Sequence, residues 1–486
     1  MFLGIDIGTS GVKAVIVTAG GGVAAQAQAP LSVSRPHELW SEQDPADWWA
    51  ATEAAVLGLP ANLRSGVRGI GLSGQMHGAT LLGADDKPLR PAILWNDGRA
   101  FAECAEIERR VPDARGITGN IAMPGFTAPK LLWVANHEPE LFARLRSVLL
   151  PKDYVRLSMT GDKASDLSDS AGTLWLDVAN RCWSEEMLAA TGLNQGQMPR
   201  LYEGSEATGA LRAEIAARWG MAAVPVAAGG GDNAAGAAGV GVIEDGDALL
   251  SLGTSGVIFV TTKDFRPNPA RAVHAFCHCL PDRWHQMSVH LSAASCVDWA
   301  ARNMGIDVPG FFALAEQAGP AAEPELFLPY LSGERTPHND PHVRGAFLGL
   351  GNDSDKGRMA AAVLEGVAFA HADGLAALRE AGTQVDNLFV IGGGARSAWW
   401  GGILAAALDV RLTYLDGGEV GPALGAANLA RIAVTGSSAA EACTRPSIAR
   451  VIEPDTALAA RLAPKLARFR AAYPALKALS GPSERT

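Results

Sequence analysis

Two aspartates in this sequence occupy positions where a carboxylate could take part in phosphoryl transfer. Asp6 lies near the end of the apolar run 2–7, two residues before the glycine that opens the turn 8–11. Asp232 follows the glycines 229–231, and these follow the apolar run 224–228. A carboxylate beside a glycine-rich turn can approach a substrate hydroxyl and accept its proton, or it can face a hydrated Mg²⁺ ion. We predict that Asp232 is a general base and that Asp6 binds the metal ion beside the phosphates.

Each aspartate also has a structural interpretation. Asp is a favoured helix N-cap, and the small residues 234–239 that follow Asp232 indicate a helix. A helix N-terminus would lower the pKa of Asp232 and weaken it as a base. Proton transfer can come late in a loose phosphoryl-transfer transition state, so the position of the carboxylate matters more than its basicity. Asp6 could be a strand-end residue that caps its turn.

The turn after Asp6 is repeated about half a chain later. Residues 7–12 read IGTSGV and residues 252–257 read LGTSGV, each between two β-rich runs. This pattern predicts a strand, a tight turn and a second strand at the start of each half. Successive backbone N–H groups at such turns can bind an anion, so the two turns could hold a triphosphate from both sides; plain turn chemistry is the alternative. The predicted phosphate-binding residues are Gly8, Thr9, Ser10, Lys13, Gly253 and Thr254, although Lys13 could equally be an exposed strand residue.

A third glycine-rich turn lies in the second half. The apolar run 388–391 leads into GGGARS at 392–397, and a helical pattern continues to residue 408. A strand, a glycine turn and a helix in this order form a common nucleotide-binding arrangement. The residues predicted to contact the nucleotide are Gly393, Gly394, Ala395 and Arg396.

The first half contains a group of polar and aromatic residues that could bind a sugar. Met76 and His77 follow one predicted strand, and Trp95, Asn96 and Asp97 follow another. Sugar recognition needs convergent hydrogen-bonding groups beside an apolar face. The alternatives are a buried structural histidine at His77 and a surface turn at residues 96–98.

The elements that must position these residues fill a chain of 486 residues, which is long enough for two or three domains. The glycine-rich stretch 236–246 is a candidate hinge, so we place the boundary between residues 243 and 244.

A net charge of −10 argues against a nucleic-acid partner. No run of about 18 apolar residues indicates a membrane span, so the expected location is the cytoplasm. The six cysteines are thinly scattered and are read as reduced thiols.

Three other patterns do not support alternative sites. Residues 69–74 match G-x-G-x-x-G, but these glycines fall within a predicted strand and no helix follows, which excludes a dinucleotide-binding turn. His274, Cys277, His278 and Cys279 resemble zinc ligands, yet alternation along a predicted strand places them on opposite faces. The chain also has no G-x-x-x-x-G-K-[ST] motif, so a P-loop kinase is unsupported.

Taken together, these motifs resemble the FGGY carbohydrate kinases. The likeness covers nearly the whole chain to about residue 430. It is carried by GIDIGTS at 4–10, WSEQDP at 40–45, GQMHG at 74–78, LWNDGR at 94–99, GGDNA at 230–234, LGTSG at 252–256, YLSGERTP at 330–337 and GGGAR at 392–396.

The resemblance implies an α/β protein with two ribonuclease-H-like, actin-like ATPase domains and a cleft between them. Residues 1–243 would bind sugar and residues 244–486 would bind nucleotide. The implied reaction uses ATP and Mg²⁺ to phosphorylate the terminal hydroxyl of D-xylulose, giving D-xylulose 5-phosphate in xylose catabolism, inside a cleft that closes. Asp232 would accept the proton, Met76, His77, Asp232 and Asn233 would contact the sugar, Thr254 would lie by the phosphates, and residues 393–396 would lie by adenosine. A homodimer is compatible with the pattern. The alternatives are another sugar specificity and an actin-like ATP-binding sensor or chaperone.

Overall fold

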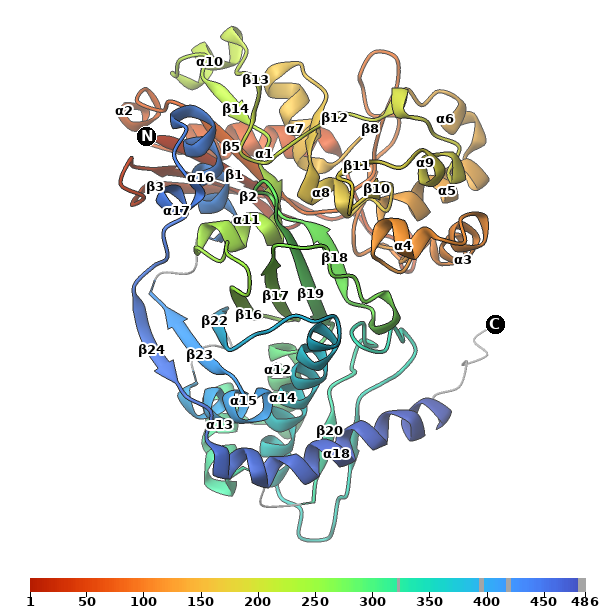
Figure 1. Cartoon of the computed structure of the whole chain (residues 1–486), viewed down its shortest axis with the longest axis vertical. Coiled ribbons are helices and arrows are strands. Elements are labelled where there is room, and N and C mark those ends of the chain that lie inside the picture. Colours follow the sequence, from red (N-terminus) through yellow and green to blue (C-terminus); the bar gives the residue numbers. More distant parts are fainter. Residues whose placement is uncertain (321–323, 393–396, 417–420, 480–486) are drawn as a thin grey trace.

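The computed structural model describes residues 1–320, 324–392, 397–416 and 421–479. Two seven-stranded sheets, one built from each half of the sequence, lie one above the other along the long axis of the molecule (Figure 1). The predicted α/β architecture is therefore confirmed.

The first sheet has the order β13-β14-β5-β1-β2-β3, with β15 beside β5. β1 and β2 form an antiparallel hairpin, whereas β1 with β5 and β5 with β14 are parallel pairs. The strands are β1 (Phe2–Ile7), β2 (Gly11–Val17), β3 (Val23–Pro30), β5 (Ile70–Gly74), β13 (Ala207–Ala210), β14 (Pro225–Ala227) and β15 (Gly230–Gly231).

The second sheet repeats this plan. Its order is β18-β19-β17-β16-β22-β23-β24, in which β16 and β17 form the antiparallel hairpin and β22 and β23 are the parallel neighbours. The repeated hairpin predicted from the two Gly-Thr-Ser-Gly turns is confirmed. The strands are β16 (Ala248–Leu252), β17 (Gly256–Thr262), β18 (His274–Cys277), β19 (Trp284–His290), β22 (Asn387–Ile391), β23 (Arg411–Leu415) and β24 (Ile448–Ile452).

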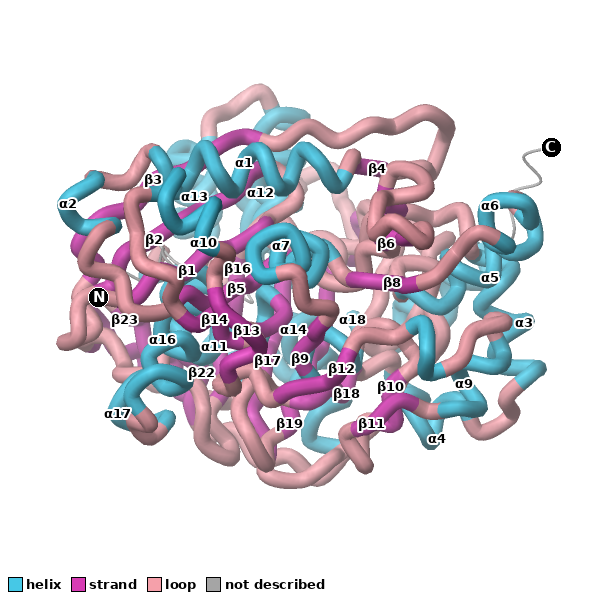
Figure 2. The backbone as a smooth tube through the Cα atoms, turned by 90° about the horizontal axis from the view of Figure 1, so that it is seen from above, coloured by secondary structure: helices cyan, strands magenta, loops and turns pink. Residues whose placement is uncertain are grey.

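Helices cover both faces of the first sheet. Alternation along β1 sends Leu3, Ile5 and Ile7 into a core with α1 (Pro45–Leu57) and α7 (Pro151–Thr160), which lie over the strands in Figure 2. Asp44 is the N-cap of α1, and its side chain accepts a hydrogen bond from the Ala46 N–H.

The opposite face packs on a helix from late in the sequence, α16 (Gly421–Thr435), which lies against β1 and β5 (Figure 1). The sheet has glycines where α16 approaches. A Cβ added at Gly4 would lie 1.8 Å from the carbonyl oxygen of Ala423, and one added at Gly71 would lie 1.8 Å from that of Ala426. The chain therefore returns to the first sheet after building most of the second.

A mainly helical region, residues 92–202, joins the first sheet to the second. Its core includes Phe126, Trp175 and Leu131 and continues into Phe276 and Met287 of the second sheet. The helices are α3 (Phe101–Arg110), α4 (Ala114–Thr118), α5 (Thr127–His137), α6 (Pro139–Ala143), α8 (Leu167–Ala171) and α9 (Glu185–Ala190), with the 3₁₀ helix η1 (Gln195–Gln197). The short strands β4 (Glu42–Gln43), β6 (Thr80–Leu82), β7 (Ala92–Ile93), β8 (Ser147–Leu149), β9 (Ala164–Asp166), β10 (Leu176–Asp177), β11 (Cys182–Trp183) and β12 (Arg200–Tyr202) pair beside them.

The core of the second half is organised by α14 (Lys356–Glu380). This helix is long and apolar enough to cross a membrane, but 94% of its most apolar window is buried inside the protein, as in a core helix. Around it lie α12 (Ala294–Met304), α13 (Val308–Ala318), α15 (Ala398–Leu408) and α18 (Thr456–Leu479), with the strands β20 (Leu326–Leu328) and β21 (Ala346–Leu348). The remaining helices are α2 (Ala61–Arg64), α10 (Ala213–Trp219), α11 (Asp232–Gly239), α17 (Ala439–Ala442) and η2 (Pro269–Arg271).

The structure corrects one expectation about the glycine-rich stretch 236–246. Gly236 and Gly239 belong to α11 rather than to a hinge loop, and a Cβ at Gly239 would lie 2.4 Å from the carbonyl oxygen of Gly421. Close packing of α11 on α16 therefore explains Gly239. Only the later glycines, Gly241 and Gly246, lie in a loop and have positive φ angles, 69° and 85°. The boundary between residues 243 and 244 stays a prediction.

The dinucleotide-like motif lies in a strand, as expected: residues 70–74 form strand β5, and the next element is strand β6 rather than a helix. The strand expected around the His and Cys cluster is shorter than predicted. His274 and Cys277 lie on β18, which pairs with β19, but β18 ends at Cys277, so His278 and Cys279 follow the strand. Among the described residues, no group of three or more His, Cys, Asp or Glu side chains could hold a metal ion.

Candidate active site

Three of the predicted catalytic and sugar-contacting residues lie at one edge of the first sheet. The parallel strands β1, β5 and β14 end there, and ligands in such sheets bind beyond the carboxyl ends of the strands. Asp6 is in register with Ser73 of β5, and Gly231 is in register with Gly74. This pairing brings Asp6, Met76 and Asp232 to the same edge, although they are far apart in the sequence.

Asp232 is the first helical residue of α11, and Gly231 is the N-cap. The prediction of Asp232 as an N-cap is therefore wrong by one position. Its Oδ1 accepts hydrogen bonds from the backbone N–H of Asn233 at 2.7 Å and from the Asn233 side-chain amide at 2.8 Å. Asn233 therefore orients the carboxylate from the adjacent position.

The electrostatic setting of Asp232 differs from the expectation. Burial, and then the nearby Asp6, raise the pKa of Asp232 to about 7, and these effects outweigh the hydrogen bonds from Asn233. Burial also raises the pKa of Asp6 to about 6, although Ser73 and Lys13 act in the opposite direction. The expected lowering by the helix N-terminus is wrong because desolvation and a like charge dominate. A carboxyl group with a pKa near 7 is well matched to general-base catalysis.

Lys13 lies directly opposite Asp6 in the β1–β2 hairpin. Its positive charge lowers the pKa of Asp6. Asp6 Oδ1 is buried and accepts no hydrogen bond from the described residues. An oxygen ligand of this kind suits a hard cation such as Mg²⁺.

In each of the two repeated turns, the N–H group of the first glycine donates a hydrogen bond to a carbonyl of the same turn. The Gly8 N–H donates to the Gly11 carbonyl at 3.0 Å, and the Gly253 N–H donates to the Ser255 carbonyl at 3.1 Å. These two glycine N–H groups are therefore not available to an anion, contrary to the expectation for Gly8 and Gly253. Ser10 and Thr254 are exposed at the tips of the turns.

The third glycine turn cannot be described in the same way. Strand β22 and helix α15 flank it as predicted, and the Ser397 hydroxyl caps α15 by accepting the Trp400 N–H. Gly393, Gly394, Ala395 and Arg396 themselves lie outside the described residues.

His77 is held in one orientation and one charge state. Its backbone has a positive φ of 68°, and its carbonyl accepts hydrogen bonds from Lys130 Nζ at 3.0 Å and Thr127 Oγ1 at 3.1 Å. Burial, together with Lys130, lowers the pKa of His77 to about 3, so the ring is neutral. Nδ1 lies 2.6 Å from the Gly172 carbonyl. Because a carbonyl only accepts, Nδ1 carries the proton and Nε2 is an acceptor.

Trp95 connects the sugar-binding candidates to the first turn. Its indole N–H donates to Thr9 Oγ1 at 2.9 Å, and Thr9 Oγ1 donates to Gln75 Oε1 at 2.9 Å. Gln75 Nε2 donates to Gln43 Oε1 at 2.9 Å, and Gln43 Nε2 donates to the Thr9 carbonyl at 2.8 Å. This ring of contacts fixes Thr9, so its hydroxyl is committed to protein partners.

Asp97 is buried, which excludes the surface-turn interpretation for this residue. Its carboxylate accepts the backbone N–H of Ser41 at 2.6 Å and pairs with the Arg99 guanidinium at 2.7 Å. The Cζ atom of Arg99 lies over the Trp40 ring, 3.5 Å from the ring centroid. Asp97 therefore supports the loop that presents Trp95 and Asn96.

A cavity of about 770 Å³ lies between the two halves. Trp95, Asn96 and Asp97 line one side, and Glu334 and Arg335 line the other. Among the described residues, its lining does not include Asp6 or Asp232. Trp95, which contacts Thr9, connects the cavity to the sheet edge where the two aspartates lie.

Two polar residues at this site were missed by sequence reasoning. Arg335 reaches into the cavity from the second half, and its Nη1 lies 3.4 Å from His274 Nε2. Lys130 is fully buried beneath His77. Lys130 had a usable signal, because it is a lone lysine in the apolar part of the segment 127–134.

The geometry combines a carboxylate with a raised pKa, a second carboxylate with an unused oxygen, and a neutral histidine beside an aromatic side chain. Such a site can bind a polyhydroxylated molecule, deprotonate one hydroxyl and hold a cation beside it. Hydrolysis is chemically compatible with the same groups.

Comparison with known proteins identifies the family. Residues 1–239 match the N-terminal domain of the FGGY family of carbohydrate kinases, and residues 248–434 match its C-terminal domain. The chain is 58% identical over 436 residues to the xylulose kinase of Escherichia coli, covering 89% of this chain and 90% of the relative. It is 52% identical over 483 residues to the xylulose kinase of Klebsiella pneumoniae, covering 99% and 100%.

A solved structure also resembles this chain over nearly its whole length. The crystal structure of a xyloylose kinase from Brucella ovis has a TM-score of 0.95 and 52% identity to this chain, covering 98% of this chain and 99% of that one. The expected two-domain fold is therefore confirmed. The chain belongs to the FGGY family of carbohydrate kinases.

Proposed function

We propose that this carbohydrate kinase transfers the γ-phosphoryl group of ATP to the terminal hydroxyl of D-xylulose, which yields D-xylulose 5-phosphate and ADP. The names of the two relatives at 58% and 52% identity support this substrate. The observation that carries the chemistry is the carboxyl group of Asp232, whose pKa is raised to about 7 at the edge of the first sheet. Closure of the cleft over both substrates stays a prediction.

In this proposal, Asp232 accepts the proton of the attacking hydroxyl. The charge on Asp232 is available near neutral pH, and Asn233 holds one carboxylate oxygen so that the other can face the sugar. Neutral His77 contributes Nε2 as an acceptor for a sugar hydroxyl, while Met76 and Trp95 supply apolar surface. Arg335 adds donors from the second half.

Mg²⁺ would be held at Asp6 through the buried Oδ1 that lacks a hydrogen-bond partner among the described residues. Because these residues offer no cluster of three candidate ligands, water and phosphate oxygens would complete its coordination, as is usual for Mg²⁺ with nucleotides. The ion would neutralise phosphate charge. Lys13, Ser10 and Thr254 are the side chains proposed to meet the phosphates, and residues 393–396 are proposed to meet adenosine.

The substrate assignment is tested by the rate of ADP release with a panel of sugars and polyols. We expect D-xylulose to give the highest kcat/KM among D-xylulose, D-ribulose, gluconate and glycerol. A higher value for one of the other three would disprove the D-xylulose assignment and leave a kinase of different specificity. ATP hydrolysis that no sugar stimulates would instead favour an ATP-driven switch protein.

Asp6→Asn is expected to raise the Mg²⁺ concentration needed for half-maximal activity by about tenfold or more, a typical effect of weakening a metal site. The amide is a weaker ligand because it lacks the negative charge. Initial rates over a range of free Mg²⁺ concentrations would measure the change, with Asp44→Asn, a substitution at an exposed N-cap, as the control. An unaltered Mg²⁺ dependence in Asp6→Asn would remove Asp6 from the metal site.

A further inference from the structure

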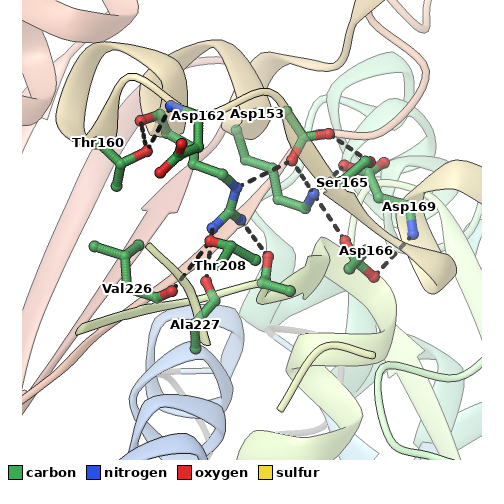
Figure 3. Close-up of polar contacts among 12 residues, drawn as sticks. Asp153, Thr160, Asp162, Ser165, Asp166, Asp169, Thr208, Val226 and Ala227 are labelled. Carbon is green, nitrogen blue, oxygen red and sulfur yellow. Dashed lines mark hydrogen bonds and ion pairs between the residues drawn. The ribbon is translucent and has the colours of Figure 1, made fainter. Parts of the chain in front are cut away.

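Five charged side chains form a cluster that is completely buried beneath the active-site edge. We call it the buried ion cluster: Lys152, Asp153 and Arg156 of α7, Asp166 of β9 and Asp169 of α8. Lys152 Nζ lies 2.6 Å from an oxygen of Asp153, 2.7 Å from one of Asp166 and 3.3 Å from one of Asp169. Figure 3 shows the three carboxylates converging, with Thr208 and Ala227 on the other side of the cluster.

Burial and the neighbouring charges shift the pKa values of this cluster in opposite directions. Burial and the neighbouring Asp166 and Asp153 raise the pKa of Asp169, although Lys152 opposes the shift. Burial lowers the pKa of Lys152, but its three acidic neighbours outweigh burial and keep it charged. Buried ion groups of this kind seldom stabilise a fold more than apolar side chains of the same size would, so its contacts with the active site matter more here than its contribution to stability.

The cluster holds the backbone that leads into Asp232. The Arg156 guanidinium donates from Nη1 to the Ala227 carbonyl at 2.8 Å and from Nη2 to the Ala228 carbonyl. The Ser168 hydroxyl donates to Asp166 Oδ2 and accepts the Gly231 N–H at 3.1 Å. Gly231 immediately precedes Asp232.

The segment 227–231 needs such anchors because it contains three consecutive glycines, which have the largest conformational freedom. Gly229 has a φ of +81°, and a Cβ there would lie 1.9 Å from the Leu72 carbonyl oxygen. Gly230 and Gly231 pair with Ser73 and Gly74 of β5. Strand β5 therefore supports one side of the segment, and the buried ion cluster supports the other.

We propose that the buried ion cluster positions the carboxylate of Asp232, acting through Arg156 and Ser168 on the backbone of residues 227–231. The proposal rests on the proposed role of Asp232 as the general base. Arg156 and Ser168 touch neither substrate nor phosphate in this scheme; they are positioning residues. Misplacement of a reacting group by about 1 Å can cost on the order of 10²-fold in rate.

The test compares two buried serines that each donate a hydrogen bond to an aspartate of the buried ion cluster. Ser168→Ala removes the acceptor of the Gly231 N–H. Ser165→Ala removes a hydroxyl that donates to Asp153 Oδ2 at 2.6 Å and accepts from the Ser170 hydroxyl at 2.9 Å, but within the described part of the chain it makes no hydrogen bond to residues 227–231. We expect Ser168→Ala to lower kcat by about 10-fold or more with little change in the KM for ATP, and Ser165→Ala to keep kcat within about twofold despite a similar loss of thermal stability.

A double-mutant cycle separates positioning from general destabilisation. If Ser168 acts through Asp232, adding Ser168→Ala to Asp232→Asn causes no further loss of kcat. Arg156→Lys is a second variant: it keeps the charge but cannot donate to two carbonyls in the same way, and it should give the same pattern. Equal losses in Ser168→Ala and Ser165→Ala, or additive losses in the cycle, would overturn the proposal.

These outcomes also separate this proposal from the proposed function. Full activity in Asp232→Asn would reject the general base and the positioning role together. A large loss in Asp232→Asn, with parental kcat in Ser168→Ala and Arg156→Lys, would reject the positioning role alone.

Discussion

Asp232→Asn is expected to lower kcat by about 10²–10⁴-fold, the usual contribution of a positioned general base. Asparagine has nearly the same size, and it retains an oxygen that can accept the two hydrogen bonds from Asn233. It cannot accept the proton of the sugar hydroxyl. ATP binding should change little, because the two turns that are proposed to hold phosphate are untouched. Sugar-independent ATP hydrolysis should also fall, since the same carboxylate would orient a competing water.

The measurement is steady-state kinetics on purified, folded protein with D-xylulose and ATP varied separately. Asp44→Asn is the matched control, because it makes the same chemical change at an exposed N-cap where asparagine is equally effective. If Asp232→Asn keeps kcat within about tenfold of the parent, which is below the usual contribution of a base, the catalytic assignment fails.

The raised pKa of Asp232 also predicts a pH dependence. The base must be deprotonated, so kcat/KM for the sugar should rise with pH through about 7 and then level off. Because Asp6 and Asp232 are neighbours, the acidic limb belongs to the pair rather than to one residue. The residual activity of Asp232→Asn should lose the limb near pH 7.

The same shift has a consequence for stability, and its sign is opposite to that of a salt-bridged aspartate. The folded-state pKa of Asp232 lies above the unfolded value of 3.8. Its protonated form therefore stabilises the fold fully below about pH 4, and this contribution is lost as the pH rises through about 7. Asp232→Asn avoids the buried charge. At pH 8 its midpoint of thermal unfolding should be at or above that of the parent, so low activity could not be attributed to unfolding.

Local patterns in the sequence were sufficient for the repeated hairpins. The two Gly-Thr-Ser-Gly turns and their flanking apolar runs are short-range signals, and both fold as antiparallel pairs at the centre of a sheet. The patterns also predicted that Asp6 lies near the end of one strand and that Asp232 follows another. Their position at one edge of the sheet is a finding of the structure, in which β1, β5 and β14 are parallel and align their carboxyl ends.

Properties that depend on distant partners could not be predicted in this way. The pKa of Asp232 reflects Asp6, which lies more than 200 residues earlier in the chain. Asp97 looks like a turn residue until Ser41 and Arg99 are placed around its carboxylate. The tail beyond residue 430 contains no recognisable motif, yet Lys465 of α18 pairs with Glu365, and Arg470 pairs with Asp373. Each of these interactions joins residues that local sequence patterns do not relate to one another, so it becomes visible only in the folded structure.

The packing of α16 between the first sheet and α11 leads to the second prediction of large effect. Gly425 lies inside α16, where an added Cβ would be 1.7 Å from the carbonyl oxygen of Ala235 and 3.0 Å from the backbone nitrogen of Gly239. These atoms belong to the backbone of α11, so no side-chain rotation can relieve the overlap. Gly425→Ala must therefore push α16 and α11 apart.

Gly402 provides the matched control. It lies inside α15, and a Cβ there meets no atom within 4 Å. Both substitutions gain about 1 kcal/mol of intrinsic helix propensity, but only Gly425→Ala creates an overlap, and severe overpacking costs about 3 kcal/mol or more. Gly402→Ala should raise the midpoint of thermal unfolding slightly, and Gly425→Ala should lower it by several degrees.

Gly425→Ala should also reduce kcat in the protein that remains folded, because α11 begins at Asp232 and any displacement of this helix moves the carboxylate. Differential scanning calorimetry and steady-state kinetics on both variants would test the two effects together. Equal unfolding midpoints for Gly425→Ala and Gly402→Ala would mean that the backbones of α11 and α16 separate at little cost. The position of Asp232 would then depend on strand β5 and the buried ion cluster, without a requirement for close helix packing.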